Sequence, residues 1–336
     1  MNLFRAEMRR LTKRRVIRFF VFGTLALLAA IVVGMFATHQ PSTPSVRAAA
    51  QAEADRDYRL AVESLAEEMR ACETARGTAQ AANYPPDCDP GYRPSKADYQ
   101  AEYYMPPTFV FREQFGLMIV TLAALLAVMA YLVGASYVGA EWSSGAMMNL
   151  LLWRPQRLRV LSTKLGALTA GLTALTVLVS AAWTGLFALV ADLRGTMDAM
   201  TSGAWQSFVL MEVRGLVLVL VAGAVGFGLA SIGRHTAMAL GTAIGAIIVF
   251  QFGLGTLLSL AQVHFVEAYL VPVWATAWMD KSITVTDWQP CDSVINPGCQ
   301  AGTLTLTWPM AGGVLAALVI LVVGVAMWTM RSRDVT

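Results

Sequence analysis

The residues that could carry out chemistry are few and scattered in this chain. The sequence has 3 His and 4 Cys among 336 residues, and it contains no G-x-x-x-x-G-K-[ST], H-E-x-x-H, G-x-S-x-G or C-x-x-C motif. It therefore lacks a P-loop for ATP hydrolysis and any recognisable catalytic centre. His39 and His264 are not spaced from the cysteines as zinc ligands would be. We expect neither a metal nor a cofactor on this chain.

The four cysteines form two local pairs along the sequence, Cys72 with Cys88 and Cys291 with Cys299. Two close pairs are typical of disulfides in an oxidising compartment, and free thiols or a metal site are the alternatives. Four cysteines allow three connectivities, which the spacing alone does not separate. Because short loops close at the least entropic cost, we favour the two local pairings.

Residues 139–164, GAEWSSGAMMNLLLWRPQRLRVLSTK, are the most informative polar segment. Ser143 or Ser144 could cap a short helix that Pro155 ends. We expect this helix to present Met147, Met148 and Leu151, within a basic rim, to a groove of a partner protein. A helix lying on anionic lipid is an equal alternative. The candidate contact residues are Glu141, Trp142, Ser144, Gly145, Met147, Met148, Leu151, Leu152, Arg154, Pro155, Arg157 and Lys164.

Six long apolar runs must position these residues. Hydrophobic residues make up 56% of the chain and charged residues 14%, and a helix needs about 20 apolar residues to cross the hydrocarbon core. The chain is thus predicted to be an all-α integral membrane protein with six transmembrane helices. We expect spans at 19–38, 115–140, 165–191, 207–233, 236–263 and 308–330, preceded by a basic amphipathic interfacial helix at 1–18.

The distribution of charge predicts the orientation of the spans. With the N-terminus inside, the inner segments are 1–18, 141–164, 234–235 and 331–336, and they carry 14 of the 25 basic residues but 3 of the 22 acidic ones. Basic residues collect on the cytoplasmic side, so both termini are expected to be cytoplasmic. The first run could be a secretory signal peptide, but its length and the lack of an A-x-A site favour an uncleaved anchor.

Three segments then lie outside, 39–114, 192–206 and 264–307. The first is predicted to hold a helix over 46–76, stopped by Gly77, followed by a Pro- and Tyr-rich stretch. It is either a module that docks an external partner or a structural lid. In the last, residues 265–279 suit a re-entrant or interfacial segment. Glu212 and Arg214, near the outer start of the fourth span, are expected to snorkel as a pair, or else to line a cavity.

The sequence resembles the permease subunit of ABC transporters of the ABC-2 class. The resemblance rests on a basic N-terminal segment containing Glu7, on six spans, and on the order of residues in 139–166. There the similar residues are Gly139-Ala-Glu141, Ser144-Gly145, Leu150 to Leu152, Arg154-Pro155, Arg157 and Lys164-Leu-Gly166. Both outer insertions, each with a Cys pair, are longer than in a minimal member.

The resemblance implies a half-transporter in a bacterial cell membrane. Its partners would be cytoplasmic ABC ATPase subunits carrying ATP and Mg²⁺, a second permease copy or a paralogue, and membrane lipid. ATP-driven closure would push on the coupling helix at 143–153, and the cargo would be a hydrophobic or amphipathic drug, lipid or peptide. A receptor or assembly factor without transport is the alternative. Secondary transport is disfavoured by the lack of paired intramembrane carboxylates, and nucleic-acid binding by a net charge of only +3.

Overall fold

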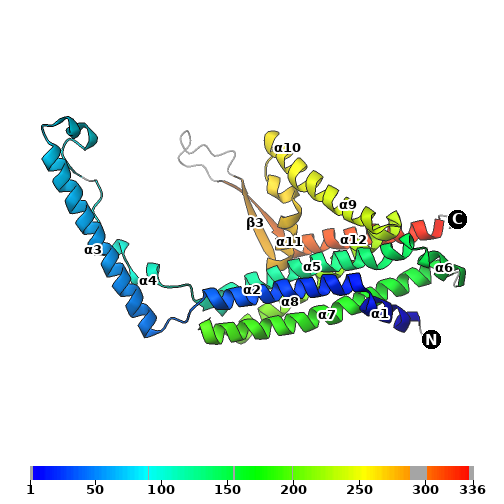
Figure 1. Cartoon of the computed structure of the whole chain (residues 1–336). Helices are drawn as coiled ribbons and strands as arrows, with labels where there is room; N and C mark the ends of the chain where they lie inside the picture. Colours follow the sequence, from blue (N-terminus) through cyan, green and yellow to red (C-terminus); the bar gives the residue numbers. More distant parts are fainter. Residues whose placement is uncertain (1–2, 90, 154–155, 199, 288–300, 333–336) are drawn as a thin grey trace. The chain divides into compact units, whose positions relative to one another are not determined.

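Among the residues that the structure describes, six helices are long and apolar enough to cross a membrane, which confirms the predicted all-α class with six spans. The structure, a computed structural model, describes residues 3–89, 91–153, 156–198, 200–287 and 301–332 (Figure 1). The spans are α2 (Arg15–Thr38), α5 (Phe111–Ser143), α7 (Arg157–Arg194), α8 (Ser202–Gly233), the run Thr236–Leu260, and α12 (Trp308–Ser332). The fifth consists of α9 (Thr236–Ala246), the π-helical turn η3 (Ile247–Gly253) and α10 (Leu254–Leu260).

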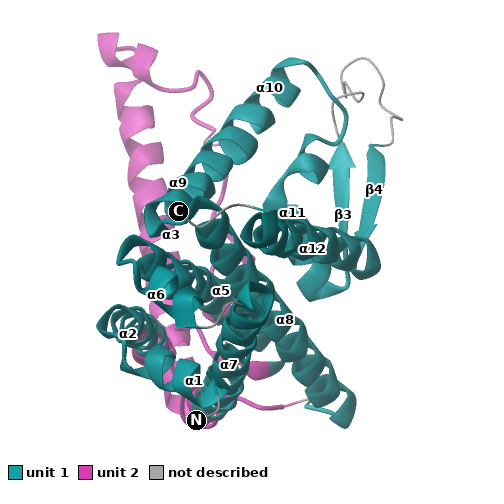
Figure 2. Cartoon of the chain, turned by 90° about the vertical axis from the view of Figure 1, so that its right-hand side faces the viewer, with its two compact units in different colours: residues 1–31, 112–186, 199–336 teal, residues 32–111, 187–198 magenta. Residues whose placement is uncertain are grey.

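The chain divides into two compact units, coloured separately in Figure 2. Unit 1 comprises residues 1–31, 112–186 and 199–336 and contains most of the six spans. Unit 2 comprises residues 32–111 and 187–198. Each unit is described separately below.

Unit 2 is built around the long helix α3 (Pro44–Ala75). The Thr43 hydroxyl accepts a hydrogen bond from the Val46 amide at 3.3 Å, and Pro44 occupies the first turn, where its missing N–H costs nothing. Gly77 follows the helix at φ +80°, a conformation that favours glycine. The helix expected at 46–76 is therefore present, with the predicted stop.

A disulfide joins Cys72, on the last turns of α3, to Cys88, which confirms the first predicted pairing. It closes a loop of 16 residues that contains η1 (Ala79–Asn83). A crosslink over a loop of this length stabilises a fold by about 3 kcal/mol in chain-entropy terms. The second predicted pair, Cys291 and Cys299, lies outside the described residues.

The rest of unit 2 contains η2 (Lys96–Asp98), α4 (Ala101–Tyr104) and a short parallel pair of strands. In that pair, β1 (Phe109–Val110) lies beside β2 (Gly195–Thr196). Phe109 is fully buried, and its ring lies 5.5 Å from Phe187 and 5.9 Å from His39. These aromatic contacts bring segments far apart in the sequence together as one small core.

In unit 1, α5 and α8 pack closely because glycines line their crossing. A Cβ added at Gly134 would lie 2.2 Å from the Gly223 carbonyl oxygen, and one added at Gly226 would lie 2.3 Å from the Tyr131 oxygen. Small residues thus let the two backbones touch, as is common between membrane helices. By contrast, a Cβ at Gly241 or Gly245, the G-x-x-x-G pair of α9, would meet nothing within 4 Å.

The segment between the fifth and sixth spans contains η4 (Val266–Tyr269), α11 (Val271–Asp280) and a hairpin that the sequence analysis missed. Strands β3 (Ser282–Asp287) and β4 (Gly302–Thr307) pair antiparallel, from Ser282 with Thr307 to Asp287 with Gly302. Ala277, Leu306 and Ala311 form a small buried core beneath them. Residues 265–279 are therefore short helical elements packed on a hairpin and α12.

Glu212 and Arg214 do not pair with each other, so the expectation of a snorkelling pair was wrong. Glu212 accepts a hydrogen bond from the Thr184 hydroxyl at 2.5 Å and lines a small cavity between α5, α7 and α8. Arg214 donates to the Met279 carbonyl at 3.1 Å. The two side chains are two residues apart on a helix, so they leave it in different directions and find different neighbours.

Replacing Gly134 with alanine should destabilise unit 1 by about 1–3 kcal/mol, because the added methyl group would overlap the Gly223 backbone and force the helices apart. Gly185→Ala is the matched control, since a Cβ there meets nothing and alanine is the better helix former. Thermal unfolding of the purified proteins in one detergent measures the difference. Equal melting temperatures for the two variants would contradict the described α5–α8 contact.

Candidate functional site

Within unit 1, the N-terminal helix α1 (Leu3–Lys13) packs at the end of the helix bundle where α6 (Ala146–Trp153) also lies (Figure 1). Glu7 and Leu11, one helical turn apart, form its buried face. The sequence analysis expected one helix over residues 1–18. The structure instead divides this segment at Arg14, and α2 begins at Arg15.

Glu7 is fully buried, and three side chains surround its carboxylate. Its Oε2 accepts hydrogen bonds from Lys164 Nζ at 2.6 Å and from the Tyr137 hydroxyl at 2.7 Å, and its Oε1 accepts one from Arg10 at 3.0 Å. Lys164 is itself fully buried near the start of α7, and Tyr137 lies near the end of α5. One carboxylate thus joins α1 to two spans.

A second buried carboxylate, that of Glu141 on α5, completes this set of contacts. Its Oε2 lies 2.7 Å from Lys164 Nζ as an ion pair without hydrogen-bond alignment, and its Oε1 accepts from Arg14 Nη2 at 2.5 Å. Arg14 also donates to the Tyr137 carbonyl oxygen at 2.6 Å, and its guanidinium lies 5.4 Å from the Tyr137 ring centre. We call Glu7, Arg14, Tyr137, Glu141 and Lys164 the base cluster.

The charges of the base cluster balance, with two carboxylates against Lys164 and Arg14. Burial raises the pKa of Glu7, but the hydrogen bonds and charges of Lys164, Tyr137 and Arg10 outweigh burial, so its pKa lies below the ordinary value. Glu7 is therefore ionised at neutral pH. Its contribution to stability is present above the pKa of the unfolded chain and is lost as the pH falls through the folded value.

The chain turns from α5 into α6 at Gly145, where φ is +72°. Glycine permits this conformation without a Cβ clash. The predicted serine cap was wrong, because Ser143 is the last residue of α5 and the Ser144 hydroxyl donates back to the Glu141 carbonyl oxygen at 3.4 Å. The turn at Gly145, rather than a capping side chain, sets the direction of α6.

The exposed face of α6 differs from the expected one. Met147 is fully buried and Leu151 is 8% exposed, so neither is presented to a partner as predicted. Instead, Leu152 is 81% and Trp153 87% exposed. The reason is that Met147 and Leu151, one turn apart, form the stripe that packs inward on the chain itself. The large exposed apolar side chains of α6 therefore lie at its C-terminal end.

The remaining candidate residues take several positions. Glu141 and Lys164 lie inside the base cluster and are not accessible to a partner. Trp142 is half-buried beneath the Arg234 guanidinium, 5.0 Å from the ring centre. Ser144 is exposed, Met148, Gly145 and Arg157 are half-buried, and Arg154 and Pro155 lie outside the described residues.

Sequence reasoning missed the partnership of Glu7, Arg14 and Tyr137 with Glu141 and Lys164. A signal was present, because Glu7 is the single acidic residue among seven basic ones in residues 1–18. A lone carboxylate on the apolar face of a short helix indicates a buried cation elsewhere in the fold. The sequence did not indicate which cation pairs with Glu7, since Lys164 lies 157 residues away.

Glu7→Gln and Lys164→Met should each destabilise the docking of α1, because each leaves an uncompensated buried charge. Losses on the order of 3 kcal/mol are expected from removing one member of a buried ion pair. The double variant leaves the balanced Glu141–Arg14 pair, so its loss should be smaller than the sum of the two single losses by 1 kcal/mol or more. Thermal unfolding and the rate of tryptic cleavage within residues 5–18 measure both effects.

Arg5→Gln is the control for this cycle, because Arg5 is an exposed charge on the same helix. It should leave unfolding within about 0.5 kcal/mol of wild type. Strict additivity of Glu7→Gln and Lys164→Met would mean that the two side chains do not interact in the folded protein.

Comparison with known proteins agrees with this architecture. Residues 1–332 match the family described as ABC-2 family transporter protein. No curated protein matches the chain. The family match covers α1, all six spans and both outer insertions. A multi-pass membrane chain, with a charged N-terminal helix fixed to the base of its second and third spans, is thus a member of the ABC-2 transporter family, whose chains are the transmembrane permease subunits of ABC transporters.

Proposed function

We propose that this chain is the membrane-spanning half of an ATP-driven exporter and that α6 transmits movement from a cytoplasmic ATPase subunit to the spans. The observation that carries the proposal is the base cluster. It connects α1, α5 and α7 through buried ion pairs immediately beside α6. A force on α6 would therefore move three helices together as one rigid element, the kind of element that couples distant sites.

The exposed end of α6 supports docking into a protein groove. Leu152 and Trp153 place two large apolar side chains next to each other with most of their surface uncovered. Tryptophan is enriched among the residues that contribute most to protein interfaces. The exposed arginines Arg159 and Arg331 line a cavity near the start of α7, the helix that follows α6, and we propose that they supply the basic rim. The docking contact is accordingly an apolar centre with a positive edge.

A second permease copy or a paralogue would complete the pathway. The fifth span supports this. None of its most apolar 18-residue window is buried, whereas 50% of the corresponding window of α8 is buried. A Cβ added at Gly241 or Gly245 would meet no atom of the described chain within 4 Å, so both positions have open space beside them. Small residues without a neighbour are suited to close packing against another helix.

The orientation and cargo belong to the same proposal. We propose that both termini, α1 and α6 lie on the cytoplasmic side of a bacterial cell membrane, because the segments that contain them, 1–18, 141–164 and 331–336, carry an excess of basic residues. We propose a hydrophobic or amphipathic drug, lipid or peptide as the cargo, because the chain contains 17 methionines, whose flexible side chains adapt to apolar ligands of irregular shape. A receptor that docks a partner through unit 2, without transport, is the second candidate, favoured only by the size of that unit.

Leu152→Asp or Trp153→Asp should reduce the recovery of ATPase subunit with the permease at least tenfold. A carboxylate buried without a partner at an interface costs several kcal/mol, and each 1.4 kcal/mol is a factor of ten. The measurement is the amount and activity of ATPase that co-elutes with tagged permease from cells expressing both.

Leu60→Asp on α3 is the matched control, because Leu60 is also an exposed leucine on a helix but lies in unit 2. It should leave ATPase recovery unchanged. If the α6 variants also recover normal amounts, and the wild type instead requires anionic lipid to hold α6, then α6 is a lipid contact and the coupling proposal fails.

Orientation can be tested by labelling single cysteines in intact cells, in a variant with Cys291 and Cys299 replaced by serine. Gln80→Cys, exposed in unit 2, should react with an impermeant thiol reagent. Ser143→Cys, exposed beside α6, should react only after the cells are opened. Labelling of Ser143→Cys from outside would reverse the proposed topology.

A further inference from the structure

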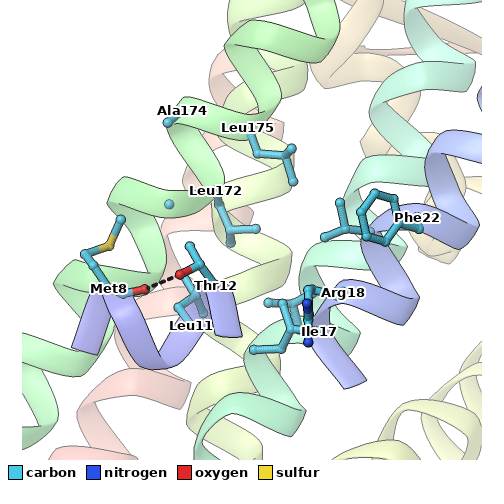
Figure 3. A pocket seen from close by; sticks show the side chains of 12 residues that line it. Met8, Leu11, Thr12, Ile17, Arg18, Phe22, Leu172, Ala174 and Leu175 are labelled. Carbon is cyan, nitrogen blue, oxygen red and sulfur yellow. Dashed lines mark hydrogen bonds between the residues drawn. The ribbon is translucent and has the colours of Figure 1, made fainter. Parts of the chain in front are cut away.

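A pocket of about 320 Å³ lies where α1 meets α2, bounded by side chains of α1, α2, α5 and α7 (Figure 3). This volume is at the lower end of the range for ligand sites in proteins. Its walls are apolar apart from Thr12 and Arg18. The Thr12 hydroxyl already donates to the Met8 carbonyl oxygen at 3.2 Å. The pocket therefore offers a ligand a hydrocarbon surface and one guanidinium.

The pocket exists because the chain bends at Arg14 and because α1 rests on a glycine of α7. A Cβ added at Gly171 would lie 2.6 Å from Leu11 Cδ2, so Gly171 lets α1 approach α7 closely. Beside this contact, Leu11 and Ile17 form the buried walls, while Arg18, Phe22 and Ala174 are exposed. The cavity thus opens onto the surface that the helices present to the bilayer.

The depth of the pocket along the bundle suits an acyl chain. Residues 171–175 follow Lys164 of the base cluster by 7 to 11 positions, which places them about 10–16 Å farther along α7 at 1.5 Å per residue. This is the region just beneath the headgroups in the leaflet next to α1. Arg18, on the first turn of α2, lies near the end of the span, where a headgroup would be.

The charge around the opening is positive and is not neutralised within the described chain. Glu7, the acidic residue of the N-terminal segment, is buried and already bound to Lys164 and Arg10. Arg9, Lys13 and Arg18 are exposed and have no carboxylate within ion-pair distance among the residues that the structure describes. Basic residues next to a membrane helix attract anionic lipid, at about 1 kcal/mol each.

We propose that this pocket binds one anionic phospholipid, with an acyl chain between α1, α2 and α7 and its phosphate on Arg18. The apolar lining selects a hydrocarbon chain, and the single guanidinium selects a negative headgroup. Binding fills the space beside the docked α1 and so stabilises it against the spans. The inference depends on the membrane location of the chain and not on its coupling to an ATPase.

The test is native mass spectrometry of the full chain in detergent, titrated with phosphatidylglycerol or with phosphatidylcholine of the same acyl chains. Wild type should retain one phosphatidylglycerol and bind phosphatidylcholine at least fivefold more weakly. Arg18→Gln should weaken phosphatidylglycerol binding about fivefold, the effect of one basic residue at the membrane surface. Arg18→Lys should keep most of the affinity for phosphatidylglycerol, because it keeps the positive charge. Ala174→Phe, which fills the opening, should weaken binding of either lipid at least tenfold.

Two controls match these variants. Arg15→Gln removes an exposed charge from the same helix outside the pocket, and Ala181→Phe adds the same bulk to an exposed site on α7 away from it. Both should bind phosphatidylglycerol within twofold of wild type. Because Arg18 is exposed, its variants should fold normally, and size-exclusion profiles check this. Equal binding of the two lipids by wild type, or equal losses in pocket and control variants, would overturn the proposal.

Discussion

The structure depends on one electrostatic constraint, which is that the carboxylates of Glu7 and Glu141 share the ammonium of Lys164 away from water. Ion pairs of this kind add little net stability over apolar packing, but breaking one is costly because the remaining charge has no solvent. The ion pairs therefore determine where the helices lie more than how stable the fold is. The base cluster permits one arrangement of α1 against α5 and α7, since any other arrangement leaves a buried charge without a partner.

That constraint connects the local features at the base of the bundle. Glu141, the residue that holds Arg14, lies on the last turn of α5, four positions before the Gly145 turn that leads into α6. Above it, Gly134 and Gly226 bring α5 into backbone contact with α8. A displacement of α6 would thus reach α8 through rigid contacts rather than through flexible side chains, because neither glycine has a side chain that could absorb the movement.

The sequence was sufficient for features that depend on composition over long windows or on short loops. The six spans follow from apolar runs, and the Cys72–Cys88 pair follows from a loop of 16 residues. It was insufficient where two faces of one element are both apolar. Met147 and Leu151 face inward while Leu152 and Trp153 face outward, and hydrophobicity does not distinguish these faces. The hairpin was missed although Ile283 and Val285 alternate with threonine and with Ser282, a pattern of period two.

The separation of the base cluster along the sequence has a consequence for biosynthesis. Helix α1 leaves the ribosome before its partners, because Tyr137 is made 130 residues and Lys164 157 residues after Glu7. At 5–20 residues per second, Lys164 is synthesised about 8–30 s after Glu7. Docking of α1 is consequently a late step, which can occur only when the third span has been inserted, and it marks the completion of the first half of the bundle.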